Sequence, residues 1–279
     1  MRRSLTFCKW TLAPVLAAAL ALPAESQAPA APAPTYADLA DLALAAPVAA
    51  QVRVADSVAV KPDRAPGLKP GHTRFFVEAD LVSLIRSPQT LPTRLSWLVD
   101  LPNDARGKAA RPRKGSEYLL LARPVPARPG ELRLVAPDAQ IPATAERAAT
   151  LRSIVREASS ASPPPRIAGI GRAFHVPGAI RGESETQIFL LTAGGTPVSL
   201  TVLRRPGQTA QWAVALSEIV DEAAAPPAPG TLLWYRLACG LPRTLPGQSL
   251  AEAGEDKAAI ESDYRLVLER LGPCVRTRK

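Results

Sequence analysis

The first half of the chain is dominated by short segments in which apolar and polar residues alternate. In residues 94–100, Leu95, Trp97 and Val99 share one face, which is the period of two of a half-buried β-strand. Similar segments occur at residues 51–54, 58–60, 74–79, 117–122 and 131–135. These strands predict a small barrel or sandwich, and their order, with a long third loop, suits an OB-like barrel.

A helix and a proline-rich segment follow the strands. Residues 146–158 place Leu151, Ile154 and Val155 on one face, the pattern of an amphipathic helix. Residues 159–165 then include three consecutive prolines, which interrupt regular structure. We therefore expect a β-rich region with a closing helix at residues 47–158, a proline-rich linker at 159–166 and a second region at 167–279.

The second region begins with strand patterns and ends with helical ones. Beyond an apolar segment at 167–170, residues 186–191, 198–204 and 212–216 are separated by glycine-containing turns and predict a three-stranded antiparallel meander. Residues 231–239 predict a helix that Gly240 ends, and residues 255–271 predict a longer one that ends before Gly272 and Pro273. The predicted fold class is α+β with mainly antiparallel strands.

The N-terminus has the pattern of a secretory signal peptide. Arg2, Arg3 and Lys9 precede 15 uncharged residues at 10–24, which is too short for a membrane-spanning helix of about 20 residues. Small residues follow, and we expect cleavage near Ala30; an uncleaved anchor is the alternative. Residues 1–30 are then a signal peptide, residues 31–46 an extended lead-in with a short helix, and the mature protein is periplasmic with no transmembrane segment.

The cysteines are few enough to predict their pairing. Cys8 is removed with the signal peptide, so that Cys239 and Cys274 remain. Two thiols in an oxidising compartment usually form a disulfide. Because each cysteine lies at or just beyond the end of a predicted helix, the disulfide requires the C-terminal ends of those two helices to lie together.

The charge balance favours an anionic partner. Formal net charge is +9, and without residues 1–30 it becomes 31 − 24 = +7. A basic protein is attracted to anionic envelope polymers or lipid headgroups, although the charge can also serve solubility alone. Export makes nucleic acid an unexpected partner.

One loop concentrates this positive charge. Five basic residues and no acidic residue occur between positions 106 and 114, namely Arg106, Lys108, Arg111, Arg113 and Lys114. A loop of this kind can bind phosphate or carboxylate groups with little geometric demand. The alternative is a solvated hairpin tip whose charges prevent aggregation at the sheet edge.

The remaining chemistry-bearing residues do not form a recognisable catalytic motif. His72 and His175 each lack a second histidine at metal-ligand spacing, and no G-x-S-x-G occurs. We therefore expect no cofactor and no metal. Trp234 and Tyr235 are adjacent on a predicted helix, so that one of them is expected in the core, while an exposed Trp234 could stack on a sugar ring.

Two pairs of carboxylates keep an enzymatic alternative open. Glu183 with Glu185, and Glu78 with Asp80, each share a strand face about 7 Å apart. Glycan hydrolysis uses two such groups on either side of a cleft. A more ordinary interpretation is that each pair is solvated.

The chain, particularly residues 73–101 and 183–239, resembles exported bacterial proteins with no assigned function. The resemblance is carried by residues 185–190 (ETQIFL) and 234–239 (WYRLAC) and implies no activity and no site residues. We therefore expect an exported cell-envelope protein, non-enzymatic, that binds a partner protein or an anionic polymer. The alternative is a glycan- or peptide-bond hydrolase whose site is assembled from dispersed residues.

Overall fold

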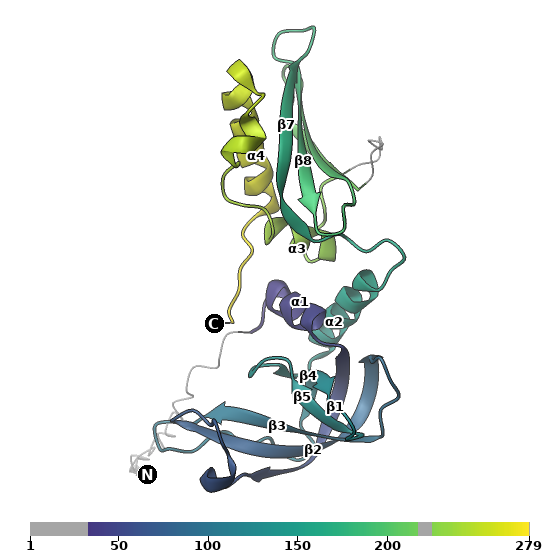
Figure 1. The fold of residues 1–279 in the computed structure, drawn as a ribbon, viewed down its shortest axis with the longest axis vertical. Coiled ribbons are helices and arrows are strands. Elements are labelled where there is room, and N and C mark those ends of the chain that lie inside the picture. The colour runs from purple at the N-terminus through teal and green to yellow at the C-terminus, as the bar shows by residue number, and fades with distance from the viewer. Residues whose placement is uncertain (1–32, 217–224, 279) are drawn as a thin grey trace, which may run out of the picture. The chain divides into compact units, whose positions relative to one another are not determined.

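A computed structural model describes residues 33–216 and 225–278 of the 279-residue chain (Figure 1). The predicted signal peptide at residues 1–30 lies outside the described residues. Residues 34–279 form one compact unit. Among the described residues, no helix has the length and apolar content needed to cross a membrane.

The first sheet closes into a five-stranded barrel. Its strands are β1 (Val48–Ala59), β2 (His72–Arg86), β3 (Arg94–Pro102), β4 (Glu117–Pro124) and β5 (Glu131–Leu134). They follow the order β1-β2-β3-β5-β4, and a further pairing of β1 with β4 closes the ring. The β3–β5 pair is parallel, whereas the other pairs are antiparallel. Of the two predicted architectures the barrel is confirmed, with the connectivity of an OB fold.

Two details of the barrel differ from the predicted strands. The sequence predicts residues 51–54 and 58–60 as separate segments, yet β1 joins them and ends at Ala59, with register shifts that include one between Val54 and Asp56. Such bulges bend a strand without ending it. A short sixth strand, β6 (Gln140–Pro142), pairs with β4 and was not predicted, because three residues carry too little alternation to be detected.

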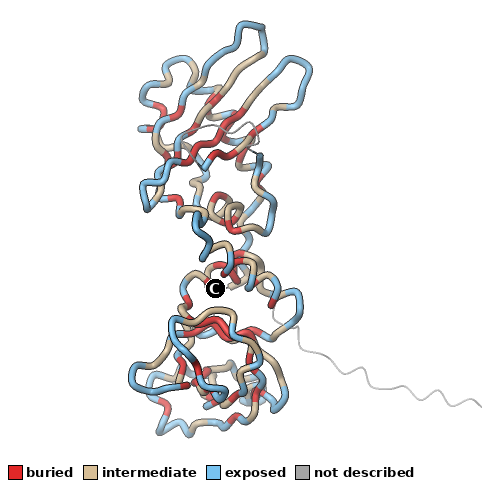
Figure 2. The backbone as a smooth tube through the Cα atoms, turned by 90° about the vertical axis from the view of Figure 1, so that its right-hand side faces the viewer, coloured by how far each residue is buried: buried red, intermediate tan, exposed pale blue. Residues whose placement is uncertain are grey.

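Buried residues recur at alternate positions along the barrel strands, as in β3, and Figure 2 colours the backbone by this burial. Phe75, Val77, Leu95, Trp97 and Leu120 belong to one buried cluster. The Trp97 indole Nε1 donates a 2.7 Å hydrogen bond to the Gln140 side chain. This bond gives the buried indole N–H the partner that it needs.

Two helices pack on the barrel. The helix α1 (Tyr36–Ala45) begins with a capping box in which Thr35 and Asp38 satisfy each other's backbone N–H groups. The helix α2 (Ala145–Ala158) begins at the N-cap Thr144 and presents Leu151 and Ile154 to the cluster that α1 also enters. Residues 159–166, the predicted linker, connect α2 to the second sheet.

The second sheet is a four-stranded antiparallel meander. Its strands are β7 (Ile167–Pro177), β8 (Ser184–Thr192), β9 (Val198–Arg204) and β10 (Gln211–Ala215), in the order β10-β9-β8-β7. The predicted three-stranded meander therefore gains β7, which extends the apolar segment 167–170 to Pro177. The helices α3 (Leu232–Ala238) and α4 (Lys257–Leu271) contribute to the core of this sheet through Leu237, Ile260 and Val267.

Short 3₁₀ turns complete the described elements. They are η1 (Pro62–Arg64), η2 (Gly247–Leu250) and η3 (Gly254–Asp256). Because η3 takes up the first residues of the segment predicted as a helix from 255, α4 begins at Lys257.

The predicted disulfide is confirmed. Cys239 is the C-cap residue of α3, and its Cα lies 5.1 Å from that of Cys274, three residues beyond the end of α4. The C-terminal ends of the two helices are therefore held together. The α+β fold class, with mostly antiparallel sheets, is likewise confirmed.

Candidate binding surface

The basic loop connects β3 to β4, and Asp104 near its start stabilises its conformation. The Asp104 carboxylate accepts hydrogen bonds of 2.9 Å from the backbone N–H groups of Arg106 and Lys108. A bridge between Asn103 and Ala109 closes the base of this turn. All five basic side chains of the loop are exposed.

Backbone and side-chain contacts bring the β1–β2 loop beside the basic loop. The Asn103 N–H donates to the Gly71 carbonyl over 2.8 Å, and the Thr73 hydroxyl donates to the Asn103 side chain over 2.7 Å. The buried Ser57 hydroxyl donates to the Pro112 carbonyl over 2.6 Å. Antiparallel pairing of β1, β2 and β3 therefore gathers residues 56–71 and 103–116 at one end of the barrel.

This end of the barrel is strongly basic. Residues 56–71 and 103–116 contain eight Lys or Arg and three Asp, an excess of 8 − 3 = 5 positive charges. We call it the basic end; its cations are Lys61, Arg64, Lys69, Arg106, Lys108, Arg111, Arg113 and Lys114. Sequence reasoning missed the first three, because only the register of β1, β2 and β3 brings their loop beside the other.

Arg111 differs from its neighbours in being anchored. Its guanidinium donates to the Ser57 hydroxyl over 3.0 Å and to the Ser57 carbonyl, and it lies 3.4 Å from Asp56. Arg106, Lys108, Arg113 and Lys114 form no ion pair within the described part of the chain. Four of the five predicted cations are thus available to a ligand.

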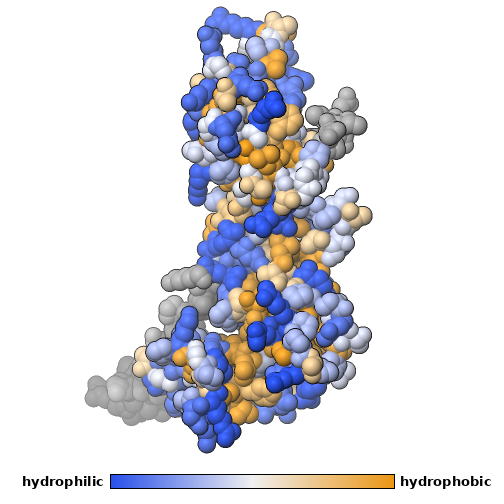
Figure 3. All heavy atoms as spheres, in the orientation of Figure 1, coloured by the Kyte–Doolittle hydropathy of each residue, from blue (hydrophilic) through white to orange (hydrophobic). Residues whose placement is uncertain are grey.

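An exposed apolar row crosses the barrel face next to the basic end. Val58, Phe76 and Leu98 are direct cross-strand partners on β1, β2 and β3, with exposed fractions of 53%, 37% and 48%. Figure 3 shows hydrophobic side chains among hydrophilic ones on the barrel surface. Phe76 follows the buried Phe75, so that two adjacent aromatic residues face opposite sides of β2.

A paired charge lies between the apolar row and the end of the barrel. Arg74 Nε and Nη2 donate to the two Asp100 carboxylate oxygens over 2.6 and 2.7 Å. This bond from Arg74 holds the pKa of Asp100 below its usual value. The charges of Arg74 and Asp100 neutralise each other, so the excess positive charge at the basic end comes from residues 56–71 and 103–116.

Trp234, the remaining predicted site residue, lies on α3 and not with the basic loop. It is half-buried, its ring meets that of Tyr36 edge-on at 6.0 Å, and its Nε1 donates to the Leu271 carbonyl over 2.8 Å. Tyr235 is buried, and its hydroxyl donates to Asp41. Tyr235 therefore belongs to the core, and Trp234 packs partly against it.

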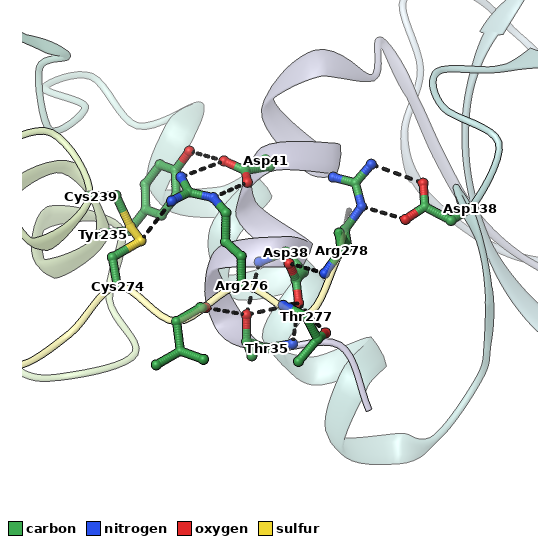
Figure 4. A network of polar contacts seen from close by, with 11 residues as sticks. Thr35, Asp38, Asp41, Asp138, Tyr235, Cys239, Cys274, Arg276, Thr277 and Arg278 are labelled. Atoms are coloured by element: carbon green, nitrogen blue, oxygen red, sulfur yellow. Dashed lines mark hydrogen bonds and ion pairs between the residues drawn. A yellow bond between two sulfur atoms is a disulfide. The ribbon is translucent and has the colours of Figure 1, made fainter. Parts of the chain in front are cut away.

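The disulfide begins a C-terminal tail that contacts α1 (Figure 4). Arg276 Nε donates to Asp41 over 2.7 Å, and Arg278 Nε donates to Asp138 over 2.6 Å. The Thr277 N–H and hydroxyl donate to the buried Asp38 over 3.0 and 2.7 Å. Burial opposes ionisation of Asp38, but the bonds from Thr277 and Thr35 outweigh it and lower its pKa to about 2.

The two carboxylate pairs have different surroundings. Asp80 forms an ion pair with Arg94 over 2.9 Å. Glu183 and Glu185 both line a cavity of about 440 Å³ together with Phe174. The Glu185 carboxylate accepts a 2.7 Å bond from Gln187.

The histidines serve local contacts, one of them in a chain of polar groups that the sequence did not reveal. His72 Nδ1 lies 3.1 Å from the Pro70 carbonyl. His175 Nδ1 lies 2.8 Å from the Thr186 hydroxyl, which donates to the buried Asp263. Arg204 in turn donates to Asp263 over 2.6 Å.

Residues 33–216 and 225–278 contain no group of three or more His, Cys, Asp or Glu side chains that could hold a metal ion.

Comparison with known proteins adds no family assignment. No protein-family model matches the chain, and no curated protein matches it either.

Proposed function

We propose that the protein is exported to the periplasm through a cleaved signal peptide and binds an anionic envelope polymer there, without catalysis, through the basic end of the barrel. The observation that carries this proposal is the excess of five positive charges on two adjacent loops beside an exposed apolar row. The resemblance to exported bacterial proteins agrees with the proposed compartment.

Two features support export. Charged residues, an uncharged stretch and small residues follow one another in residues 1–30. The Cys239–Cys274 disulfide is typical of proteins that fold in an oxidising compartment. N-terminal sequencing of periplasmic material should find a first residue between Glu25 and Pro32, and a retained Met1 would contradict cleavage.

The exposed apolar row beside the basic end suits a polymer that has apolar surfaces as well as acidic groups. The ring faces of a sugar polymer can pack on Phe76 and Leu98 while its acidic groups meet the loops. In OB-fold barrels the face of strands 2 and 3, with the loop between the first two strands, commonly binds oligonucleotides and oligosaccharides. That precedent is an analogy of fold, and the charges and exposed side chains carry the argument.

The test measures how strongly charge-reversal variants are retained on immobilised polygalacturonate. Only basic residues of the loop that form no ion pair within the described part of the chain are reversed. The test variant carries R106E, K108E, R113E and K114E and leaves the bonded Arg111 intact. The control carries R181E, R205E, R243E and R265E, four exposed arginines of the second half, so that the net charge is the same.

We expect the test variant to bind at least roughly 30-fold more weakly than the control. Four exposed charges at about 0.5 kcal/mol each contribute about 2 kcal/mol, which is roughly 30-fold in Kd. Adding F76A and L98A should weaken retention at high salt, where charge attraction is screened. Equal retention of test and control variants would refute the site, and selective loss of a co-purified protein in the test variant would assign the surface to a partner protein instead.

Hydrolysis is the second candidate, because Glu183 and Glu185 line one cavity beside an aromatic side chain. If the protein is a hydrolase, the wild type must turn over a substrate, and E183Q and E185Q must each abolish that turnover. Release of reducing ends from peptidoglycan by the wild type and by neither variant would favour this candidate over the binding module.

A further inference from the structure

A cavity of about 650 Å³ lies away from the basic end and is lined by three arginines, Arg86, Arg166 and Arg236. Its walls come from the ends of α1 and β2, the proline-rich connection 161–166, the turn between β8 and β9, and α3. No carboxylate lines it among the residues that the structure describes. Three cations at a concave site with no acid among its described lining residues are an arrangement that attracts an anion.

Arg86 has only part of its hydrogen-bonding capacity satisfied. Its Nη2 donates to the carbonyl oxygens of Ala43 and Ala46 at the C-terminal end of α1. Its Nε is buried and has no hydrogen-bond partner within residues 33–216 and 225–278. Burial lowers the pKa of Arg86, and no acid of the described residues forms an ion pair with it.

Arg236 also has an unpartnered nitrogen, although its guanidinium lies over the Tyr235 ring, 5.8 Å from the ring centre. Its Nε is also buried without a partner in the described part of the chain. Burial lowers its pKa, Tyr235 opposes this, and the positive charge of Arg166 lowers it further. Two guanidinium groups that repel each other across a cavity are stabilised when an anion lies between them.

The rest of the cavity suits an anion that carries an organic body. Ser162 and Thr196 supply hydroxyl groups at its rim, and Leu44 and Pro164 supply apolar wall. Its volume is within the range of about 300–1,000 Å³ that is usual for small-molecule sites. A phosphate monoester carries a charge of about −1.5 to −2, which balances three arginines better than a single carboxylate does.

We propose that this cavity, the arginine pocket, binds the phosphate group of a small organic phosphate through Arg86, Arg166 and Arg236. Arginine matches phosphate oxygens with paired N–H donors, and three arginines line this cavity. The pocket does not share residues with the basic end, and the proposal stands independently of polymer binding.

The test is isothermal titration calorimetry of the full mature chain with glucose 1-phosphate, with gluconate and glucose as the carboxylate and uncharged comparisons. R236Q removes a half-buried charge, and R166Q removes an exposed one, whose loss should change stability little. R181Q is the matched control, because Arg181 is exposed and lines none of the cavities described above. Thermal melting without ligand accompanies each variant.

We expect glucose 1-phosphate to bind at least tenfold more tightly than gluconate, and glucose not to bind. R236Q and R166Q should each weaken binding about tenfold, the loss of one charge-assisted hydrogen bond, while R181Q leaves it unchanged. R236Q also removes the contact of the Arg236 guanidinium with the Tyr235 ring, so its melting temperature without ligand must first show that the variant is folded. The proposal is overturned if R166Q and R236Q bind like the wild type, or if the basic-end variant loses binding as well.

Discussion

Replacing Cys239 and Cys274 with serine removes the bond that ties the end of α3 to the C-terminal tail. The two cysteines are 35 residues apart, so the unfolded chain is closed into a loop of that size. Loop-closure entropy for this length amounts to about 13 cal/mol/K, or about 4 kcal/mol at 25 °C. The tail's own contacts are weaker, since the Arg276–Asp41 and Arg278–Asp138 pairs are partly exposed and contribute at most about 1 kcal/mol each.

The loss should therefore arise mainly in the unfolded state. The folded variant keeps the tail contacts, whereas its unfolded chain becomes free to expand. We expect the free energy of unfolding to fall by about 4 kcal/mol and the urea dependence to steepen slightly, because a chain without the cross-link exposes more surface. For an m-value of about 2 kcal/mol/M, the midpoint falls by about 2 M.

Urea titration monitored by tryptophan fluorescence measures both quantities. The wild type in reductant is the matched control and should coincide with the C239S/C274S variant in midpoint and slope. A midpoint that moves by less than about 0.5 M would refute the entropic reasoning. Two reactive thiols in denatured, unreduced protein would refute the bond itself.

Three further substitutions test contacts in the fold. D38N should lower the free energy of unfolding by about 2 kcal/mol at pH 7, because folding lowers the pKa of Asp38 from its ordinary 3.8 to about 2. This stability is present above pH 4 and is lost as the pH falls towards 2. The unfolding curves of wild type and variant should therefore converge near pH 2. W97A should cost about 3–5 kcal/mol in urea unfolding, since it empties the barrel core and orphans Gln140. R111Q should cost about 1 kcal/mol while R113Q costs nothing measurable, because only Arg111 bonds to Ser57; equal melting temperatures would contradict the anchoring role.

The sequence determined the elements whose burial repeats along the chain. The alternation in residues 94–100 predicted β3, and the apolar positions from Ile260 to Leu271 predicted α4, because a periodic apolar face is a local property. It also determined the disulfide, since Cys239 and Cys274 are the two cysteines that follow the predicted signal peptide.

Only the tertiary structure decided which distant groups meet. The parallel pairing of β3 with β5 and the closure of β1 on β4 depend on register over the whole barrel, and they place the β1–β2 loop beside the basic loop. Arg86, Arg166 and Arg236 come from β2, the proline-rich connection and α3, far apart in the chain, and no spacing predicts that they line one cavity. The strands were predictable because the period of apolar residues shows which face of an element is buried. The arginine pocket was not predictable, because the convergence of polar side chains depends on how the elements pack.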